Sequence, residues 1–492
     1  MAITCGIDNG TQSTKVLIYD SEKKVVLAQG QASHELISRK DGSREQDAAS
    51  WIAALKDCFN QIALSIRESI EAIGVSGQQH GFVPLDKEGN VLSLVKLWCD
   101  TSTQKECDEI NSALGGEDKA IKIAGNAIKV GYTASKVLAF KKYQRDKYAR
   151  LAKILLPHDY LNYVLTGEYT TECGDASGTG YFDLKNKCWS QEVLSAIDKD
   201  QDWDSVLPRL VKSNESAGTV TKEASLLFGI KEGIPVSCGG GDNMMGAIGT
   251  GTVTEGALTM SIGTSGTLYA YSDVPVIDEA GSLAAFCSSS GGYLPLLCTM
   301  NCTVSSEVTR SLWDMDVKSF DKLASTSPIG ADGVIMLPFF NGERSPNYPN
   351  GKGTLFGLDL NNFNKANIAR SAMEASIYGL MYGLDSFKAL GFVPKSVTLI
   401  GGGAKSALWR QMVSDITGLE VKLPLQKEAA AFGGALQALA LLSDKSLSEL
   451  TKEHILFDSS LSTYPNKESF EEYKKSYKAW LEKVNFVSSI YS

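Results

Sequence analysis

The fold is decided by the segment Ile3-Thr4-Cys5-Gly6-Ile7-Asp8-Asn9-Gly10-Thr11-Gln12-Ser13-Thr14-Lys15-Val16-Leu17-Ile18-Tyr19. Two apolar runs, at residues 3–7 and 15–19, flank a polar turn with glycine near its tip, which predicts a β-hairpin. Successive backbone N–H groups at such a tip can hold phosphate oxygens, and Thr11 and Gln12 add side-chain donors. A turn with a structural role alone is the alternative, because this turn type is common.

The residues after the hairpin extend it into a layered domain. A third strand is expected over residues 24–30, and Asp47 is placed to cap a helix whose apolar residues recur at helical spacing. A buried strand over residues 70–75 follows, ending at Gln78-Gln79-His80. This order of strands, helix and strand predicts an α/β domain.

A second copy of the pattern begins near the middle of the chain. Residues 257–261 and 267–271 flank the turn Gly263-Thr264, which lies 253 residues after Gly10-Thr11. Another apolar run, residues 397–400, leads into Gly401–Gly403 and a helix starting near residue 406. The repeat predicts two duplicated domains, 1–245 and 246–492, with coincidence of two hairpins as the alternative. A chain of 492 residues also exceeds the roughly 250–300 residues of a single core.

Composition excludes several classes of protein. Lysine and arginine total 48 against 57 acidic residues, and a net charge of −9 argues against a nucleic-acid or anionic-membrane binder. The ten cysteines contain no Cys-x-x-Cys pair and there are only four histidines, so neither a zinc site nor a disulfide framework is expected. No secretory leader and no run of about 18 apolar residues is found. We therefore expect a cytoplasmic protein without a membrane segment.

Polar residues at the ends of predicted strands suggest chemistry. Asp242 follows Gly239–Gly241 and could accept a proton from a hydroxyl group, although capping the helix that starts near Met244 is the alternative. Asp8 could reach a Mg²⁺ ion bound to the phosphates that the first turn holds. Gln79 and His80 suit hydrogen bonding to hydroxyl groups, although a lone histidine is more often structural.

These glycine-rich motifs, in this order, resemble the FGGY family of carbohydrate kinases over nearly the whole chain. The segments that carry the resemblance are Asp8–Thr11, Gly77–Gly81, Gly239–Asn243, Gly263–Gly266 and Gly401–Gly403. The resemblance implies two duplicated actin/Hsp70-like (ribonuclease H-like) ATPase domains with an interdomain cleft. It also implies ATP as the phosphoryl donor, Mg²⁺ as cofactor, a ketopentose such as D-xylulose as acceptor, and a possible homodimer.

The resemblance further implies roles for single residues. Asp242 matches the catalytic base and Asp8 the acid that holds Mg²⁺, while Gln79 and His80, with Asp242 and Asn243, match the sugar-binding set. The nucleotide-binding set comprises Gly10, Thr11, Gln12, Thr264, Trp313, Gly402 and Gly403. Two alternatives stay open: another kinase of the family acting on ribulose, L-xylulose, glycerol or another polyol, and a non-kinase actin-like ATPase, which would not need His80 or Asp242.

Overall fold

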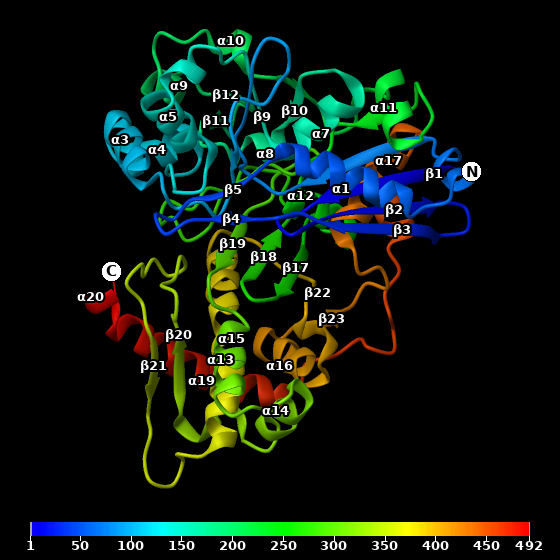
Figure 1. The fold of residues 1–492 in the computed structure, drawn as a ribbon. Coiled ribbons are helices and arrows are strands. Elements are labelled where there is room, and N and C mark those ends of the chain that lie inside the picture. The colour runs from blue at the N-terminus through cyan, green and yellow to red at the C-terminus, as the bar shows by residue number, and fades with distance from the viewer. Residues whose placement is uncertain (1, 492) are drawn as a thin grey trace.

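The structure, a computed structural model, describes residues 2–491 and builds each half of the chain around its own sheet (Figure 1). The first sheet has the order β14-β15-β6-β1-β2-β3, and β16 pairs with β6. Its strands are β1 Ile3–Asn9, β2 Ser13–Asp20, β3 Val25–Ser33, β6 Ala72–Gly77, β14 Ser216–Thr219, β15 Pro235–Ser237 and β16 Gly240–Gly241.

The second sheet repeats the centre of the first, with the order β19-β18-β17-β22-β23. In each sheet an antiparallel hairpin, β1/β2 or β17/β18, is joined in parallel by the next central strand, β6 or β22. Both predicted hairpins are therefore confirmed. The strands are β17 Ala257–Ile262, β18 Gly266–Ala270, β19 Leu296–Thr299, β22 Ser396–Ile400 and β23 Val421–Lys422.

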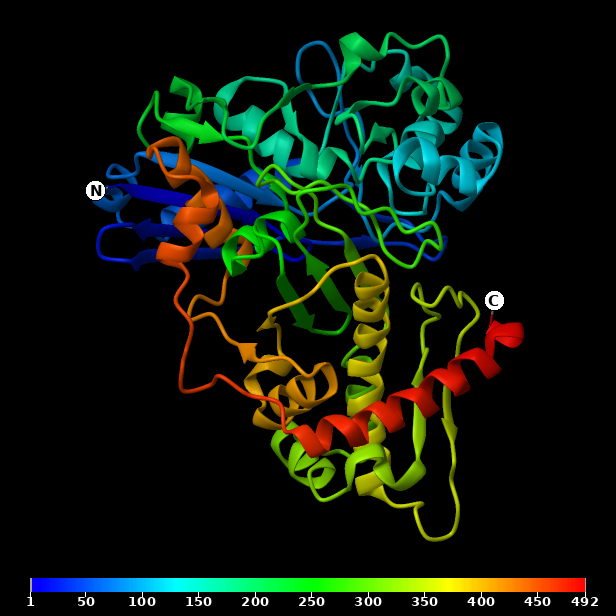
Figure 2. The same ribbon diagram turned by 180° about the vertical axis from the view of Figure 1, so that it is seen from behind.

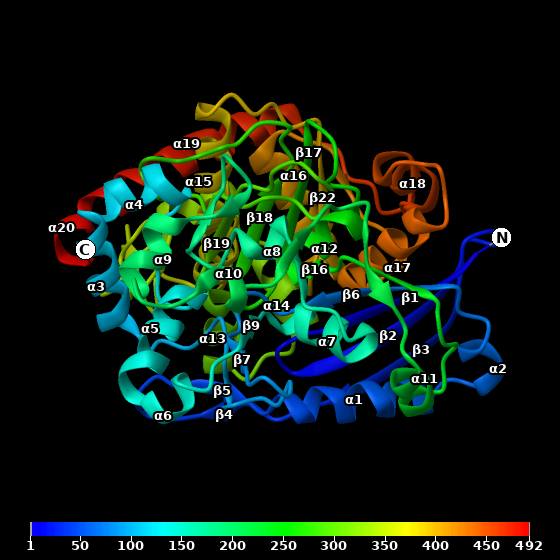
Figure 3. The same ribbon diagram turned by 90° about the horizontal axis from the view of Figure 1, so that it is seen from above.

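Alternating side chains bury both faces of the first sheet. Val16 contributes to the core under α1 (Ala48–Asn60), whereas its neighbour Leu17 contributes to the core under α17 (Ala429–Leu441). Asp47 caps α1 as predicted, because its side chain accepts a hydrogen bond from the Ala49 N–H. Thus α17, from the C-terminal part of the chain, covers one face of the sheet built from the N-terminal part (Figures 1 and 3).

Glycines allow α17 to approach its neighbours at backbone distance. A Cβ atom added to Gly6 of β1 would lie 1.7 Å from the Ala431 carbonyl oxygen, and one added to Gly249 of α12 (Asp242–Thr250) would lie 1.9 Å from that of Ala429. Any larger residue would push the elements apart. Because α17 packs on the first sheet and on α12, which spans residue 245, the division into 1–245 and 246–492 remains our proposal.

The remaining helices surround these layers. A separate helical core beside the first sheet contains α3 and α5. In the second half α13, α14 and α16 pack around α15, and α19 crosses in front of α15 in Figure 2. The bounds are α3 Gln104–Leu114, α4 Glu117–Ala124, α5 Thr133–Tyr143, α7 Pro157–Thr166, α9 Gln191–Ile197, α13 Val304–Leu312, α14 Val317–Ala324, α15 Lys365–Ala389, α16 Ala407–Thr417 and α19 Lys467–Phe486.

Two expectations from composition can be compared with residues 2–491. In that part of the chain, no helix is both long enough and apolar enough to cross a membrane. All ten cysteines lie within it and are free thiols, as their scattered spacing predicts.

Candidate active site

The central strands of the first sheet end at one edge and bring two predicted acids there. In the parallel ladder Asp8 of β1 lies beside Ser76 of β6, and Ser76 lies beside Gly240 of β16. The Ser76 hydroxyl donates a 2.9 Å hydrogen bond to the Asp8 carboxylate. Asp242 follows β16 directly, so the sheet register carries both acids to this edge.

Asp242 is the first residue of α12 rather than its cap, since the cap position is occupied by Gly241. Its Oδ1 accepts hydrogen bonds from the Asn243 backbone N–H at 2.8 Å and from the Asn243 Nδ2 at 3.1 Å. Burial, with smaller contributions from the charges of Asp8 and Asp175, raises the pKa of Asp242 to about 7. A carboxylate with this pKa can accept a proton near neutral pH.

Asp8 lies in a similar environment. Burial raises its pKa to about 6, against the opposing effects of the Ser76 hydrogen bond and the Lys15 charge. Lys15 is itself paired with Glu428 at 2.5 Å, so it is shared between two acids. The Asp8 carboxylate fits Mg²⁺ as an oxygen ligand, since the ion favours oxygen ligands from one or two carboxylates.

The predicted sugar-binding residues meet beside Asp242. The Asn243 side-chain amide donates a 2.7 Å hydrogen bond to the Gln79 side-chain oxygen, joining residues 164 positions apart. Gln79 is only 5% exposed and lies against Gly241, where an added Cβ would come within 2.6 Å of its Cγ. The glycine before Asp242 therefore makes room for this amide pair.

His80 occupies an unusual backbone conformation, with a φ of +62° that non-glycine residues seldom adopt. Its ring lies 5.0 Å from the ring of Tyr132 and 5.7 Å from that of Phe286, centroid to centroid. Its carbonyl oxygen accepts a hydrogen bond from the buried Lys136 ammonium at 2.6 Å. Burial, followed by the charges of Lys136 and Arg344, lowers the pKa of His80 well below 6.5, so the ring is neutral at pH 7.

Sequence reasoning missed the residues that surround this cluster. Tyr132 directly precedes α5, and Lys136 lies within it. Asp175 belongs to the short helix α8 (Cys173–Ala176), and Phe286 lies in a segment without charged residues. Burial lowers the pKa of Lys136 to about 7. A lysine within a fully buried run of α5 was the one signal that could have indicated a functional environment.

The first turn carries three residues of the predicted nucleotide-binding set. Gly10 closes the turn with a hydrogen bond from its N–H to the Ser13 carbonyl oxygen at 3.1 Å. The Thr11 hydroxyl accepts a 3.0 Å hydrogen bond from the Trp98 indole, while Gln12 is exposed. Thr11 is thus fixed by Trp98, while Gln12 at the same turn is exposed to solvent.

The second turn and the glycine loop lie side by side because β17 and β22 run in parallel. Thr264 is exposed at the tip, and its carbonyl oxygen accepts a hydrogen bond from the Cys302 N–H. A Cβ on Gly402 would have no atom within 4 Å, whereas one on Gly403 would lie 2.4 Å from an Ile262 methyl carbon. The backbone at Gly402 is therefore accessible to a ligand, whereas Gly403 packs against Ile262.

Trp313 is the remaining member of the predicted nucleotide-binding set. It follows α13 directly, half-buried, with its ring centroid 6.3 Å from that of Phe320 and the Lys365 ammonium 5.5 Å from its ring. These contacts belong to the core of the second half, so the nucleotide role of Trp313 stays a prediction.

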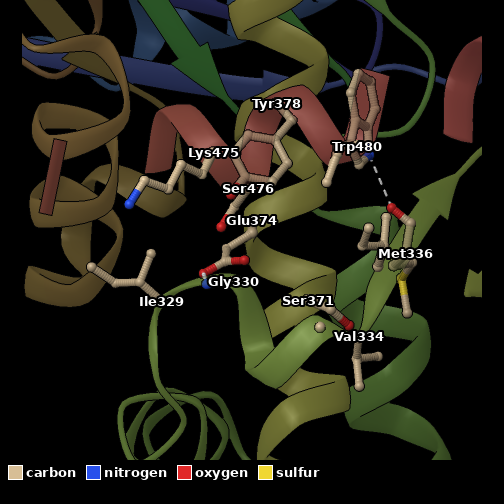
Figure 4. A pocket seen from close by; sticks show the side chains of 13 residues that line it. Ile329, Gly330, Val334, Met336, Ser371, Glu374, Tyr378, Lys475, Ser476 and Trp480 are labelled. Carbon is tan, nitrogen blue, oxygen red and sulfur yellow. Dashed lines mark hydrogen bonds between the residues drawn. The ribbon is translucent and has the colours of Figure 1, made fainter. Parts of the chain in front are cut away.

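A cavity of about 290 Å³ lies elsewhere, between α15, α19 and the segment Ile329–Gly333 (Figure 4). Glu374 points into it, and Trp480 closes one side with an indole hydrogen bond to the Met336 carbonyl oxygen at 3.0 Å. None of the predicted site residues lines this cavity. The candidate site is therefore defined by the strand ends and not by this pocket.

Comparisons with known proteins agree with the arrangement. The N-terminal domain of the FGGY family of carbohydrate kinases matches residues 3–249, and the C-terminal domain matches residues 258–442. A protein named xylulose kinase from Haemophilus influenzae is 45% identical over 484 residues, covering 97% of this chain and 98% of its own length. One of the same name from Escherichia coli is 33% identical, covering 90% and 91%.

A solved structure shows the same architecture. The crystal structure of xylulose kinase from Bifidobacterium adolescentis superposes with a TM-score of 0.84 at 29% identity, covering 96% of this chain and 99% of that one. The two domain matches, the full-length relatives and the fold lead to one conclusion: the chain belongs to the FGGY family of carbohydrate kinases, and it is a sugar kinase.

Proposed function

We propose that this sugar kinase phosphorylates the terminal hydroxyl of a ketopentose, converting D-xylulose and ATP to D-xylulose 5-phosphate and ADP. The observation that carries the proposal is the position of Asp242, which lies beside Asp8 and next to the Asn243–Gln79 amide pair. The substrate is taken from the relatives named xylulose kinase. A base, a second acid and hydroxyl-binding amides are the groups that this reaction requires.

Asp242 acts as the general base. Its carboxylate accepts the proton of the terminal hydroxyl while that oxygen forms a bond to the γ-phosphorus, and the bond from phosphorus to the bridging oxygen of ADP breaks. Gln79, His80 and Asn243 bind the remaining hydroxyl groups and fix the direction of attack. The Asn243 hydrogen bond to Asp242 keeps the carboxylate at the start of α12.

ATP lies between the two halves in this proposal. The turn of Gly10, Thr11 and Gln12 holds phosphate oxygens, Thr264 holds them from the second half, and Gly402, Gly403 and Trp313 border the nucleoside. Asp8 would hold Mg²⁺, which when bound neutralises charge on the phosphates. The open backbone at Gly402 and the exposed Thr264 support these assignments.

A coupled assay of ADP release tests the function. The acceptors to compare are D-xylulose, D-ribulose, L-xylulose and glycerol, each with Mg·ATP and with a no-sugar control. We expect the largest kcat/KM for D-xylulose and at most slow release without sugar. A larger value for another acceptor would replace the substrate, and ADP release independent of every sugar would contradict the kinase mechanism.

A homodimer and a cytoplasmic location stay predictions. Light scattering after size-exclusion chromatography measures the first: the monomer mass is 52.9 kDa, so a dimer would have twice that mass. A mass of one chain over the working concentration range would contradict it.

A further inference from the structure

Two buried polar atoms face each other beside the sugar-binding cluster without forming a hydrogen bond. Within residues 2–491, neither Nδ1 of His80 nor Oδ1 of Asp175 has a hydrogen-bond partner, and the two atoms are 3.9 Å apart. The Asp175 side chain is fully buried, and that of His80 is 12% exposed. Buried polar atoms are nearly always paired, and these two face each other at a distance that a small shift of the ring would close.

The Asp175 carboxylate is fixed from its other side. Its Oδ2 lies 3.1 Å from Nδ1 of His158, whose Nε2 lies 2.9 Å from the Asp159 carboxylate. Burial acts against a charge on His158, but the two carboxylates prevail and raise its pKa well above 6.5. His158 is therefore a buried cation, and it opposes the effect by which burial raises the pKa of Asp175.

The His80 ring has little freedom to turn away from Asp175. A Cβ added to Gly178 would lie 2.1 Å from its Cε1 and 2.4 Å from its Nδ1, so this edge of the ring rests on the Asp175–Gly178 turn. The Gly178 N–H donates to the Asp175 carbonyl oxygen at 2.9 Å, which makes the turn compact. The rings of Tyr132 and Phe286 lie close by as well.

We propose that Asp175 is a positioning residue that holds His80 in the tautomer with its proton on Nδ1. A neutral imidazole has one N–H donor and one acceptor nitrogen, so a proton shared with Asp175 leaves Nε2 as an acceptor. A sugar hydroxyl then donates to Nε2. This role rests on the proposed function, in which His80 contacts the sugar.

The tautomer can be read without sugar, ATP or turnover. Nitrogen NMR of the full chain with ¹⁵N-labelled histidine contains signals from four residues, and a His80→Asn variant identifies those of His80. We expect a protonated Nδ1 and an unprotonated Nε2 near neutral pH. A proton on Nε2 would overturn the proposal whatever the enzyme phosphorylates, so this result is separate from the test of function.

Asp175→Asn supplies the second arm. An amide can accept from His158 through its oxygen and donate to His80 through its nitrogen, so we expect the His80 proton to move to Nε2. The site would lose its acceptor, and KM for the sugar would rise about ten- to a hundredfold, with a change in kcat and in KM for ATP below about threefold. An unchanged tautomer or an unchanged sugar KM would overturn the proposal.

Two controls accompany that variant. Asp183→Asn alters an aspartate whose side chain accepts hydrogen bonds from Lys185 and Asn186 in its own turn, and it should change neither reading. The signals of His454, whose Nδ1 lies 2.8 Å from the Tyr19 hydroxyl, should keep their positions in Asp175→Asn. Thermal unfolding establishes that the variant is folded, and the wild-type spectrum decides the proposal if it is not.

Discussion

The hairpins β1/β2 and β17/β18 have the same backbone arrangement, but they differ in the residue two positions before the turn glycine. Asp8 of β1 and Ser261 of β17 each stand two positions before the turn glycine, and each is paired in register with the parallel strand alongside. Asp8 faces Ser76 there, whereas Ser261 faces Ile400. The repeat has thus preserved the position of the turn glycine, while only the first copy carries an acid two positions before it.

A second pair of equivalent positions differs for reasons of packing. Gly6 of β1 lies under the backbone of α17, where no side chain fits. Its counterpart Thr259 of β17 has room for a side chain, and its hydroxyl forms hydrogen bonds of 2.8 and 2.6 Å with those of Thr250 and Thr252. The halves therefore resemble each other in strand order, but each has its own contacts with α12 and α17.

The largest effect is expected from removing Asp242, the proposed base. Asp242→Asn keeps the shape of the side chain but cannot accept a proton, so kcat should fall by about 10²–10⁴. Sugar and nucleotide binding, measured separately by calorimetry, should remain detectable. Asp316→Asn, at the cap of α14, is the matched control and should keep kcat. A kcat of Asp242→Asn near that of the control would remove Asp242 from the role.

Making the first hairpin like the second should have the next largest effect. Asp8→Ser gives both hairpins the same residue, and we expect turnover with Mg·ATP to fall roughly a hundredfold, because Mg²⁺ loses the carboxylate that the proposal assigns to it. Sugar affinity should change little. The reciprocal control Ser261→Ala should retain most activity. Equal losses in the two variants would show that the acid is not what distinguishes the hairpins.

The acid limb of the pH profile measures how the two acids are coupled. Asp242 must be ionised to act, and burial together with the Asp8 charge raises its pKa to about 7, so kcat/KM should decline as the pH falls below that value. Removing the negative charge in Asp8→Asn lowers the pKa of Asp242 and should move the residual limb to lower pH. A limb that stays in place would mean that the two carboxylates do not interact.

The smallest effect is expected in the second half, at the glycine loop. Gly402→Ala adds a methyl group to open space, so the melting temperature should stay within about 1 °C, while KM for ATP rises about two- to fivefold because the backbone can no longer approach the nucleotide. Gly403→Ala is the contrast, since its methyl group would overlap Ile262 and lower stability. A Gly402→Ala enzyme with unaltered KM would remove the loop from the nucleotide site.

The sequence predicted those elements whose conformation depends on neighbouring residues in the chain. Apolar runs around Gly10-Thr11 and Gly263-Thr264 predict the hairpins, because strand and turn preferences act over a few residues. The position of α17 could not be predicted in this way. Its residues 429–441 are almost wholly apolar, which predicts burial but does not show which element the helix packs against. It contacts Gly6 and Gly74, which are more than 350 residues away in the sequence.

The same distinction applies to the site. Asp8, Asp242 and Gln79 could be singled out because each lies at or just beyond the end of a predicted strand and within two residues of a glycine, where side chains reach a ligand. Asp175 and Phe286 could not, since each is an ordinary residue in its own segment. They reach His80 only because α8 and the uncharged stretch fold back over the sheet edge, and that depends on packing between distant segments.

The position of Asp242 depends on the angle at which α12 crosses α17. At Gly249 and Gly433 the two helices touch backbone to backbone, and we take this crossing as the pivot for any change in the angle between them. Asp242 lies about 10 Å from the pivot along the axis of α12, at 1.5 Å per residue. A turn of α12 by about 10° would therefore carry the carboxylate through nearly 2 Å, which spans the difference between contact and separation from a hydroxyl. The position of the proposed base therefore depends closely on the angle at which these two helices pack.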